Sequence, residues 1–224
     1  MRLNLGCGRA QFPTQKDNQY TAHLQYLPFT ALDPDERWIN IDRVGIDGVD
    51  EVVDLFTYPW IRSKNGNPWN NSVCDEMWAS HMVEHIPHDA RFAQVATTMH
   101  RSQGSLDGWY AWFYEAWRIL KPGGLLHIVA PMAFSTGAMM DPSHTRYILP
   151  QSFGYMVPNP DAPFDYQIAA RFEQFDQITV RASQHWASVA KENNMTQQQI
   201  EWAGHVNNNV FDELYICLRA IKDE

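Results

Sequence analysis

The chain has few cysteines and no long hydrophobic run, and both features narrow the class of protein to which it can belong. Its three cysteines, Cys7, Cys74 and Cys217, are scattered and odd in number, so they do not indicate a disulfide framework. No apolar run approaches the about 18 residues that a transmembrane helix needs. No charged-then-apolar leader precedes the first predicted strand. We therefore expect no membrane association and a reducing, cytoplasmic location.

Basic residues are also scarce. The 224 residues include 17 lysines and arginines against 26 aspartates and glutamates, which gives a formal net charge of −9. This balance opposes non-specific nucleic-acid binding, which needs a basic surface to neutralise phosphates. Hydrophobic residues make up 45% of the chain and aromatic residues 13%, so the composition is that of a globular protein with one domain.

A glycine turn lies at the start of the sequence. The stretch Leu3-Asn4-Leu5 reads as a strand that runs directly into Gly6-Cys7-Gly8. Glycine has no Cβ, so it adopts positive φ and lets a ligand approach the backbone closely. A strand that ends in such a turn is typical of an open α/β sheet that holds a nucleotide-like ligand, although a short Gly-x-Gly string also occurs in plain tight turns.

Further strands and helices follow at the spacing of an α/β sheet. Trp38–Asp42 is a short apolar strand that ends in a carboxylate, the group that accepts hydrogen bonds from ribose hydroxyls in nucleotide-binding α/β folds. Apolar periodicity and glycine stops predict the other elements. They are strands over 49–55, 73–81, 125–131 and 210–220, and helices near 14–26, over 106–120 and from about 181 to 193.

These elements resemble the class I S-adenosylmethionine-dependent methyltransferase family over roughly residues 1–132. The glycine loop carries the resemblance together with four further strings in the family's order, at 40–42, 53–55, 80–86 and 115–124. The last strings are similar to the subgroup that acts on small molecules and glycans. The resemblance implies a Rossmann-like, doubly wound α/β fold with a mostly parallel seven-stranded sheet, an antiparallel last strand and an inserted lid.

The resemblance also implies S-adenosylmethionine as the cofactor. We expect Gly6 and Gly8 to face its methionyl part, Asp42 its ribose and Asp54 its adenine amino group. The alternative for the two glycines is a plain turn. For Asp42 it is a surface acid or a helix cap, and for Asp54 it is an Asx turn. The expected cofactor-binding residues are Leu5, Gly6, Cys7, Gly8, Asp42, Asp54, Leu55, Ser80 and His81.

The segment before the last strand is longer than a connection between two strands requires, so we expect it to form the substrate lid. The single domain then divides into a cofactor-binding core, this lid and terminal strands, at 1–132, 133–199 and 200–224. In the lid, His144 is an expected catalytic base and substrate ligand, and Arg146 is expected to bind a substrate anion. The alternative is a turn stabilised by Asp141.

The string after the fourth predicted strand holds the remaining candidates. We expect His81 to border the transferred methyl group, either as a catalytic base or packed on the cofactor, and Glu84 and His85 to bind the substrate. His81-x-x-Glu84-His85 also matches the inverted zinc-hydrolase motif, whose histidines must share one helical face. Pro87 disfavours the long helix that this motif requires, so we predict no metal site.

Methyl transfer requires mainly that the protein align two reactants, and a general base is optional. The predicted acceptor is an oxygen or nitrogen of a small polar molecule or sugar. Two other functions stay open, namely a non-catalytic partner-binding protein with this fold and an NAD-dependent oxidoreductase. Against the latter, glutamine at position 11 replaces the third glycine of the dinucleotide fingerprint. A homodimer could complete the site.

Overall fold

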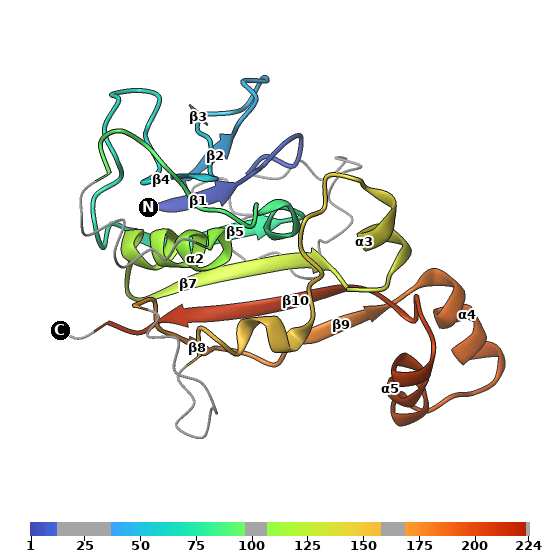
Figure 1. Cartoon of the computed structure of the whole chain (residues 1–224). Coiled ribbons are helices and arrows are strands. Elements are labelled where there is room, and N and C mark those ends of the chain that lie inside the picture. Colours follow the sequence, from blue (N-terminus) through green and yellow to red (C-terminus); the bar gives the residue numbers. More distant parts are fainter. Residues whose placement is uncertain (13–36, 97–106, 158–168, 223–224) are drawn as a thin grey trace.

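The centre of the molecule is a mixed sheet (Figure 1). The computed structural model describes residues 1–12, 37–96, 107–157 and 169–222, so the helix expected near 14–26 lies outside the described residues. Within them the sheet has eight strands in the order β3-β2-β1-β5-β7-β10-β8, and β9 also pairs with β10. The strands are β1 (Arg2–Leu5), β2 (Trp38–Asp42), β3 (Glu51–Val52), β5 (Cys74–Ser80), β7 (Leu120–Pro131), β8 (Phe172–Gln174), β9 (Thr179–Ala182) and β10 (Phe211–Ala220).

The neighbouring strands from β3 to β7 run parallel. Strand β1 lies inside this group, where Leu3 is in register with Ile39 of β2 and with Met77 of β5. Leu3 and Leu5 are completely buried, as expected for a parallel strand that is covered on both faces. Strand β10 is antiparallel to β7. The predicted Rossmann-like α/β fold, with a mostly parallel sheet and an antiparallel last strand, is therefore confirmed.

The sheet has one strand more than the seven expected, because two short strands share the outer edge of β10. Strand β8 pairs with residues 218–220, and β9 pairs with residues 211–215. Both short strands come from segment 133–199, which thus contributes to the sheet as well as to loops. In segment 200–224 the structure has most of one helix and a single strand. The division into core, lid and terminal strands stays a prediction.

Helix α2 (Gly108–Ile119) confirms the helix predicted over 106–120. It begins where the Asp107 carboxylate accepts a hydrogen bond from the backbone N–H of Trp109, which satisfies one of the free donors of the first turn. A Cβ on Gly108 would lie 2.1 Å from the carbonyl oxygen of Pro87, so only glycine allows this close approach. Ten of its twelve residues are buried, and the helix lies along β5 and β7 in Figure 1.

The core divides into two clusters because side chains alternate between the faces of a strand. The larger cluster contains Leu3, Met77 and the apolar side chains of α2, such as Trp112. The smaller cluster consists of Phe12, Trp38, Trp78 and Val129. The strands between these clusters are therefore held rigidly, which fixes the positions at which their carboxyl ends open into loops.

The remaining elements lie around the sheet. They are β4 (Thr57–Tyr58) and β6 (Arg91–Phe92), which form a second small sheet, the 3₁₀ turns η3 (Val83–His85) and η4 (Pro150–Phe153), and the helices α3 (Thr136–Met140), α4 (Gln184–Glu192) and α5 (Gln197–Val206). Helices α4 and α5 lie beyond the ends of β9 and β10 in Figure 1. Among the described residues, no helix is both long and apolar enough to cross a membrane.

Candidate functional site

A cavity of about 390 Å³ opens at the carboxyl ends of β1, β2 and β5. The chain continues from β1 to one side of the sheet and from β5 to the other, so the cavity lies at the switch point where α/β sheets bind ligands. It is lined by Gly6, Asp42, Arg43, Val53, Asp54, Leu55, Phe56, His81, Met82, His85, Pro87, Arg91 and Ser143. A neighbouring cavity of about 260 Å³ shares Gly6 and His81 with it.

The glycine turn forms one wall of both cavities. Gly6 has a φ of +63° and Gly8 a φ of +48°, the left-handed conformation that glycine adopts at no steric cost. A Cβ on Gly6 would lie 2.8 Å from Cγ of Met82, and the turn therefore fits closely against the loop after β5. Burial, with a smaller contribution from Asp42, raises the pKa of the Cys7 thiol to about 12. Cys7 is thus a neutral packing residue rather than a nucleophile.

Asp42 links the glycine turn to the end of β2. Its Oδ2 accepts a hydrogen bond from the N–H of Gly8 at 2.8 Å, and its Oδ1 accepts one from the N–H of Val44 at 2.9 Å. The carboxylate is held in place at the cavity wall by these bonds. A carboxylate oxygen accepts more than one hydrogen bond, so Asp42 retains acceptor capacity for ligand hydroxyls.

Asp54 adopts the Asx turn that was its alternative reading, and it also lines the cavity. Its Oδ1 accepts a hydrogen bond from the N–H of Phe56 at 3.1 Å, and its Oδ2 accepts one from the hydroxyl of Thr57 at 2.8 Å. The guanidinium of Arg91 lies 3.9 Å away. Leu55 completes this side of the cavity. The turn and a ligand-binding role are compatible, because the turn fixes the direction of the carboxylate.

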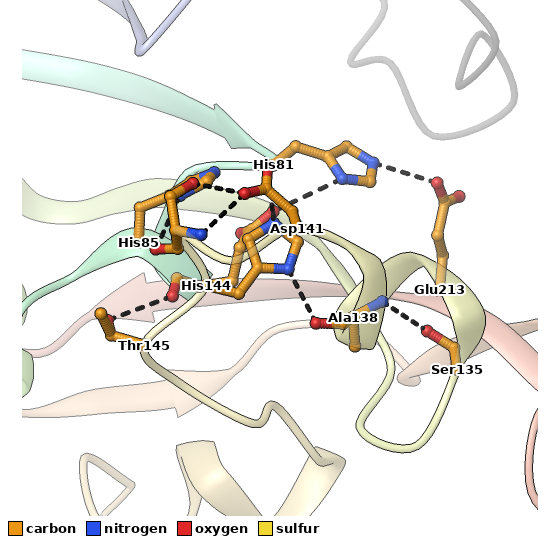
Figure 2. A network of polar contacts seen from close by, with 10 residues as sticks. His81, His85, Ser135, Ala138, Asp141, His144, Thr145 and Glu213 are labelled. Carbon is orange, nitrogen blue, oxygen red and sulfur yellow. Dashed lines mark hydrogen bonds and ion pairs between the residues drawn. The ribbon is translucent and has the colours of Figure 1, made fainter.

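His81 follows β5 with a φ of +51°, an uncommon conformation for a residue with a side chain. Figure 2 shows its ring turned toward Glu213 of β10, and Nε2 lies 3.0 Å from Oε1 of that residue. Nδ1 lies 3.5 Å from Oε1 of Glu84. Burial lowers the pKa of His81, but the interactions with Glu213 and Glu84 outweigh it and raise the pKa to about 9. An imidazole that is protonated at neutral pH is a poor acceptor for a substrate proton.

Glu84, His85 and His144 come together beside the cavity. One ligand atom from each lies within 4.8 Å of the others. The loop that carries His144 is fixed to η3, because the N–H groups of Thr145 and Arg146 donate to the carbonyl oxygen of Glu84 at 2.9 and 3.0 Å. As expected from Pro87, η3 is a single three-residue turn, so the long helix of the zinc-hydrolase motif is absent here.

Arg146 has a different setting from the one that anion binding would need. Its Nε donates to the carbonyl oxygen of Ile86 at 3.0 Å, and its Nη2 donates to that of Pro87 at 2.8 Å and to Oδ1 of Asp107 at 3.2 Å. Arg146 does not line the larger cavity. Its guanidinium instead fastens the loop after α3 to η3 and to the start of α2.

The structure gathers most of the expected site residues at one edge of the sheet. Six of them line the larger cavity, namely Gly6, Asp42, Asp54, Leu55, His81 and His85. Cys7 and Ser80 line the smaller cavity, whereas Leu5 is buried within β1. Seven further lining residues were not among the expected site residues, namely Arg43, Val53, Phe56, Met82, Pro87, Arg91 and Ser143. Arg43 and Phe56 directly follow predicted residues, so only their adjacency could have indicated them.

No protein-family model matches this chain, and no curated protein matches it in sequence. Solved structures do match it. The [4+2]-cyclase SpnF aligns with a TM-score of 0.50 and 14% identity over 99% of this chain and 74% of its own. A SAM-dependent methyltransferase from Archaeoglobus fulgidus aligns at 0.45 with 11% identity, over 97% and 85%. One from Mesorhizobium loti aligns at 0.46 with 10% identity, over 97% and 89%.

The strand order, the glycine turn after β1 and the carboxylate at the end of β2 occur together in one sheet. SpnF, with a TM-score of 0.50, aligns over almost the whole of this chain. The chain therefore has a Rossmann-like α/β fold, which it shares with SpnF.

Proposed function

We propose that the protein binds S-adenosylmethionine in the larger cavity and transfers its methyl group to an oxygen or nitrogen of a small polar molecule or sugar. One observation carries the proposal: Gly6, Asp42 and Asp54 lie on the wall of one cavity at the switch point of the sheet. A glycine turn and two carboxylates are the groups that the methionyl, ribose and adenine parts of the cofactor need.

In this proposal each group acts through binding or positioning. Gly6 and Gly8 let the cofactor approach the backbone, Asp42 accepts from the ribose hydroxyls, and Asp54 accepts from the adenine amino group. Leu55 packs against the adenine. Cys7 and Ser80 line the neighbouring cavity, which shares the Gly6 wall. The cofactor supplies the activated methyl group when bound, and the protein aligns the acceptor with it, a contribution of several kcal/mol in comparable systems, up to about 7–11 kcal/mol.

The surroundings of His81 are rich in charge. Its positive charge is balanced by the carboxylates of Glu84 and Glu213. At the cavity wall the carboxylates of Asp42 and Asp54 are accompanied by the guanidinium groups of Arg43 and Arg91. His81 therefore acts as a positioning residue here, and the proposal assigns no general base.

The proposal is tested by calorimetric titration with S-adenosylhomocysteine, with NAD titrated in parallel. We expect the wild type to bind S-adenosylhomocysteine and not NAD. Asp42→Ala should weaken binding by about 10- to 150-fold, because hydrogen bonds to a charged group contribute about 1.5–3 kcal/mol. The matched control is Asp47→Ala, an exposed acid five residues further along the same loop. Binding of NAD alone, or equal binding by both variants, would contradict the proposal.

One observation favours a second function. SpnF, whose TM-score is 0.50, is described as a cyclase, so this fold also occurs in a protein with a different activity. If the protein binds S-adenosylhomocysteine but transfers no labelled methyl group to a panel of sugars, nucleosides and amines, a role without methyl transfer takes precedence. A non-catalytic partner-binding protein is the simplest form of that role.

A further inference from the structure

A buried carboxylate without a hydrogen-bond partner lies beside the cavity. The side chain of Glu84 is completely buried, and neither of its carboxylate oxygens meets a hydrogen-bond partner among the described residues. The nearest nitrogens are Nδ1 of His81 at 3.5 Å and Nε2 of His144 at 4.0 Å. A buried charge is costly unless it is paired or binds a metal ion. In the proposed function this carboxylate only balances the charge of His81, and it contacts neither the cofactor nor the acceptor.

Nε2 of His144 lies near two carboxylates, those of Glu84 and Asp141. Nδ1 of His144 lies 3.0 Å from the carbonyl oxygen of Ala138, a group that only accepts, so Nδ1 carries the proton (Figure 2). Nε2 of His144 is then the ring nitrogen that is left for a metal ion. It lies 4.0 Å from Glu84 and 3.7 Å from Oδ2 of Asp141. Metal-binding histidines commonly have one ring N–H fixed by a carbonyl in this way.

His85 has the same arrangement. Its Nδ1 lies 3.3 Å from the carbonyl oxygen of Ser143 and 3.2 Å from the hydroxyl oxygen of that residue. The hydroxyl donates its own proton to Oδ1 of Asp141 at 2.6 Å, so it accepts from His85. Nδ1 of His85 is therefore the protonated nitrogen, and Nε2 is the free one. The rings of His85 and His144 are 4.7 Å apart.

We propose that Glu84, His85 and His144 bind a divalent transition-metal ion such as zinc, with Asp141 as a fourth ligand or an outer partner. Two imidazoles and a carboxylate are a ligand set that zinc and its neighbours accept. The three ligand atoms lie within 4.8 Å of one another. In a tetrahedral site with bonds of about 2.1 Å they would be about 3.4 Å apart, so binding requires side-chain movements of about 1 Å.

The cluster lies where a bound ion could contact a molecule in the larger cavity. His85 and Ser143 line the larger cavity, so a coordination position that the protein leaves free would face it. A doubly charged centre at this wall would bind a molecule that offers oxygen atoms, such as a diol or a carboxylate. The binding of that molecule rests on the proposed function, in which the cavity holds the acceptor. The metal site itself does not depend on it.

The full chain without a histidine tag is treated with EDTA, dialysed and titrated with Zn²⁺ alone by calorimetry. We expect one ion per chain with a Kd below about 1 µM. Titration with Co²⁺ should give an absorption spectrum typical of nitrogen and oxygen ligands. Glu84→Gln and His144→Gln should each weaken Zn²⁺ binding by at least about 100-fold, because even residues outside the ligand set cost 10- to 100-fold.

The matched control is His185→Gln, since His185 is an exposed histidine on α4 outside the cluster, and it should bind Zn²⁺ as the wild type does. If Glu84→Gln does not fold, His85→Asn replaces it as the test. The metal proposal is overturned if the wild type binds Zn²⁺ more weakly than about 100 µM, or if the cluster variants bind it as tightly as the control.

The two proposals fail separately. Zn²⁺ is titrated without S-adenosylhomocysteine, and S-adenosylhomocysteine is titrated in EDTA. Metal binding without S-adenosylhomocysteine binding would leave the metal site in place and remove the proposed methyl transfer. The reverse result would remove only the metal site.

Discussion

Gly6 and His81 follow neighbouring parallel strands, and both have a positive φ. They also line both cavities. At Gly6 the conformation is free of strain, whereas at His81 it is maintained by the ion pairs of the ring with Glu84 and Glu213. The backbone conformation of these two residues therefore determines which of their atoms face a ligand.

Substitution of Gly6 by alanine should affect both stability and binding. A left-handed alanine costs about 1–2 kcal/mol, and the added Cβ would approach Met82 at the wall of both cavities. Gly66→Ala is the matched control, because Gly66 has a φ of +67° and its added Cβ would meet no atom within 4 Å. Urea unfolding should show a loss of stability for both variants, and the loss should be larger for Gly6→Ala because of the contact with Met82. Only Gly6→Ala should lose affinity for S-adenosylhomocysteine, and equal affinity would contradict the proposed cavity.

Residue positions were predicted well where a local string identified them. The glycine turn and the acid after β2 are read directly from a few adjacent residues. Glu213 could not be found in this way, because it lies 132 residues from His81 and its strand shows only alternation. The role predicted for Arg146 rests on its residue type and on a similar string in the family subgroup, and neither reveals the three backbone carbonyls that accept from its guanidinium.

At the scale of elements, a buried ion pair joins α2 to the loop over residues 60–71. Glu115 accepts from the N–H of Trp60 and from Arg118, and Arg118 also donates to the carbonyl oxygen of Trp69. Glu115 and Arg118 are almost completely buried. Both residues belong to the string at 115–124 that carries the family resemblance. Only the structure reveals that they hold the loop over residues 60–71 in place.

Two ion pairs with the same N–O distance of 2.7 Å allow burial to be tested separately from geometry. Arg118→Met should reduce the free energy of unfolding by about 3–5 kcal/mol, because it leaves Glu115 charged and buried. Lys121→Met removes the exposed pair with Asp75 and should cost no more than about 1 kcal/mol. Urea denaturation of both variants measures the difference. Equal losses would show that burial does not govern these pairs.

Elements long enough to show a hydrophobic period lie close to their predicted bounds, whereas β3, β8 and β9, strands of two to four residues, do not. Helix α2 and strands β2, β5 and β10 lie close to their predicted bounds. The strand predicted over 49–55 is only two residues long. Strands β8 and β9 have three and four residues, too few for a period, and they form because β10 offers an unpaired edge. The helix predicted from about 181 begins at Gln184, because β9 occupies the residues just before it.

At the scale of the whole molecule, cofactor binding should raise the melting temperature. A ligand at 100 times its Kd stabilises the folded state by about 2.7 kcal/mol. For a chain of this size that corresponds to about 5–10 °C. Differential scanning fluorimetry with S-adenosylhomocysteine should show this shift, and NAD at the same concentration should not. The absence of a shift at a concentration well above the measured Kd would contradict binding to the folded protein.

The fold class was accessible from the sequence because each βα unit carries its own local signals. The arrangement of the site was less accessible, since it depends on contacts between segments far apart in the chain. The cluster of Glu84, His85 and His144 shows this difference. Its first two members were recognised within a zinc-like string, but the partner histidine comes from a loop about 60 residues away rather than from His81.

Arg146 holds the loop after α3 against η3, and this affects the path by which small molecules reach the larger cavity. The hydrogen bonds of Arg146 and of the N–H of Thr145 close the side of the cavity formed by η3, and all of them would have to break for that side to open. Arg43 and Arg91 also line this cavity, and both are exposed. We therefore expect ligands to enter and leave past these two arginines rather than past η3, so bulky substitutions at the two positions should slow ligand exchange.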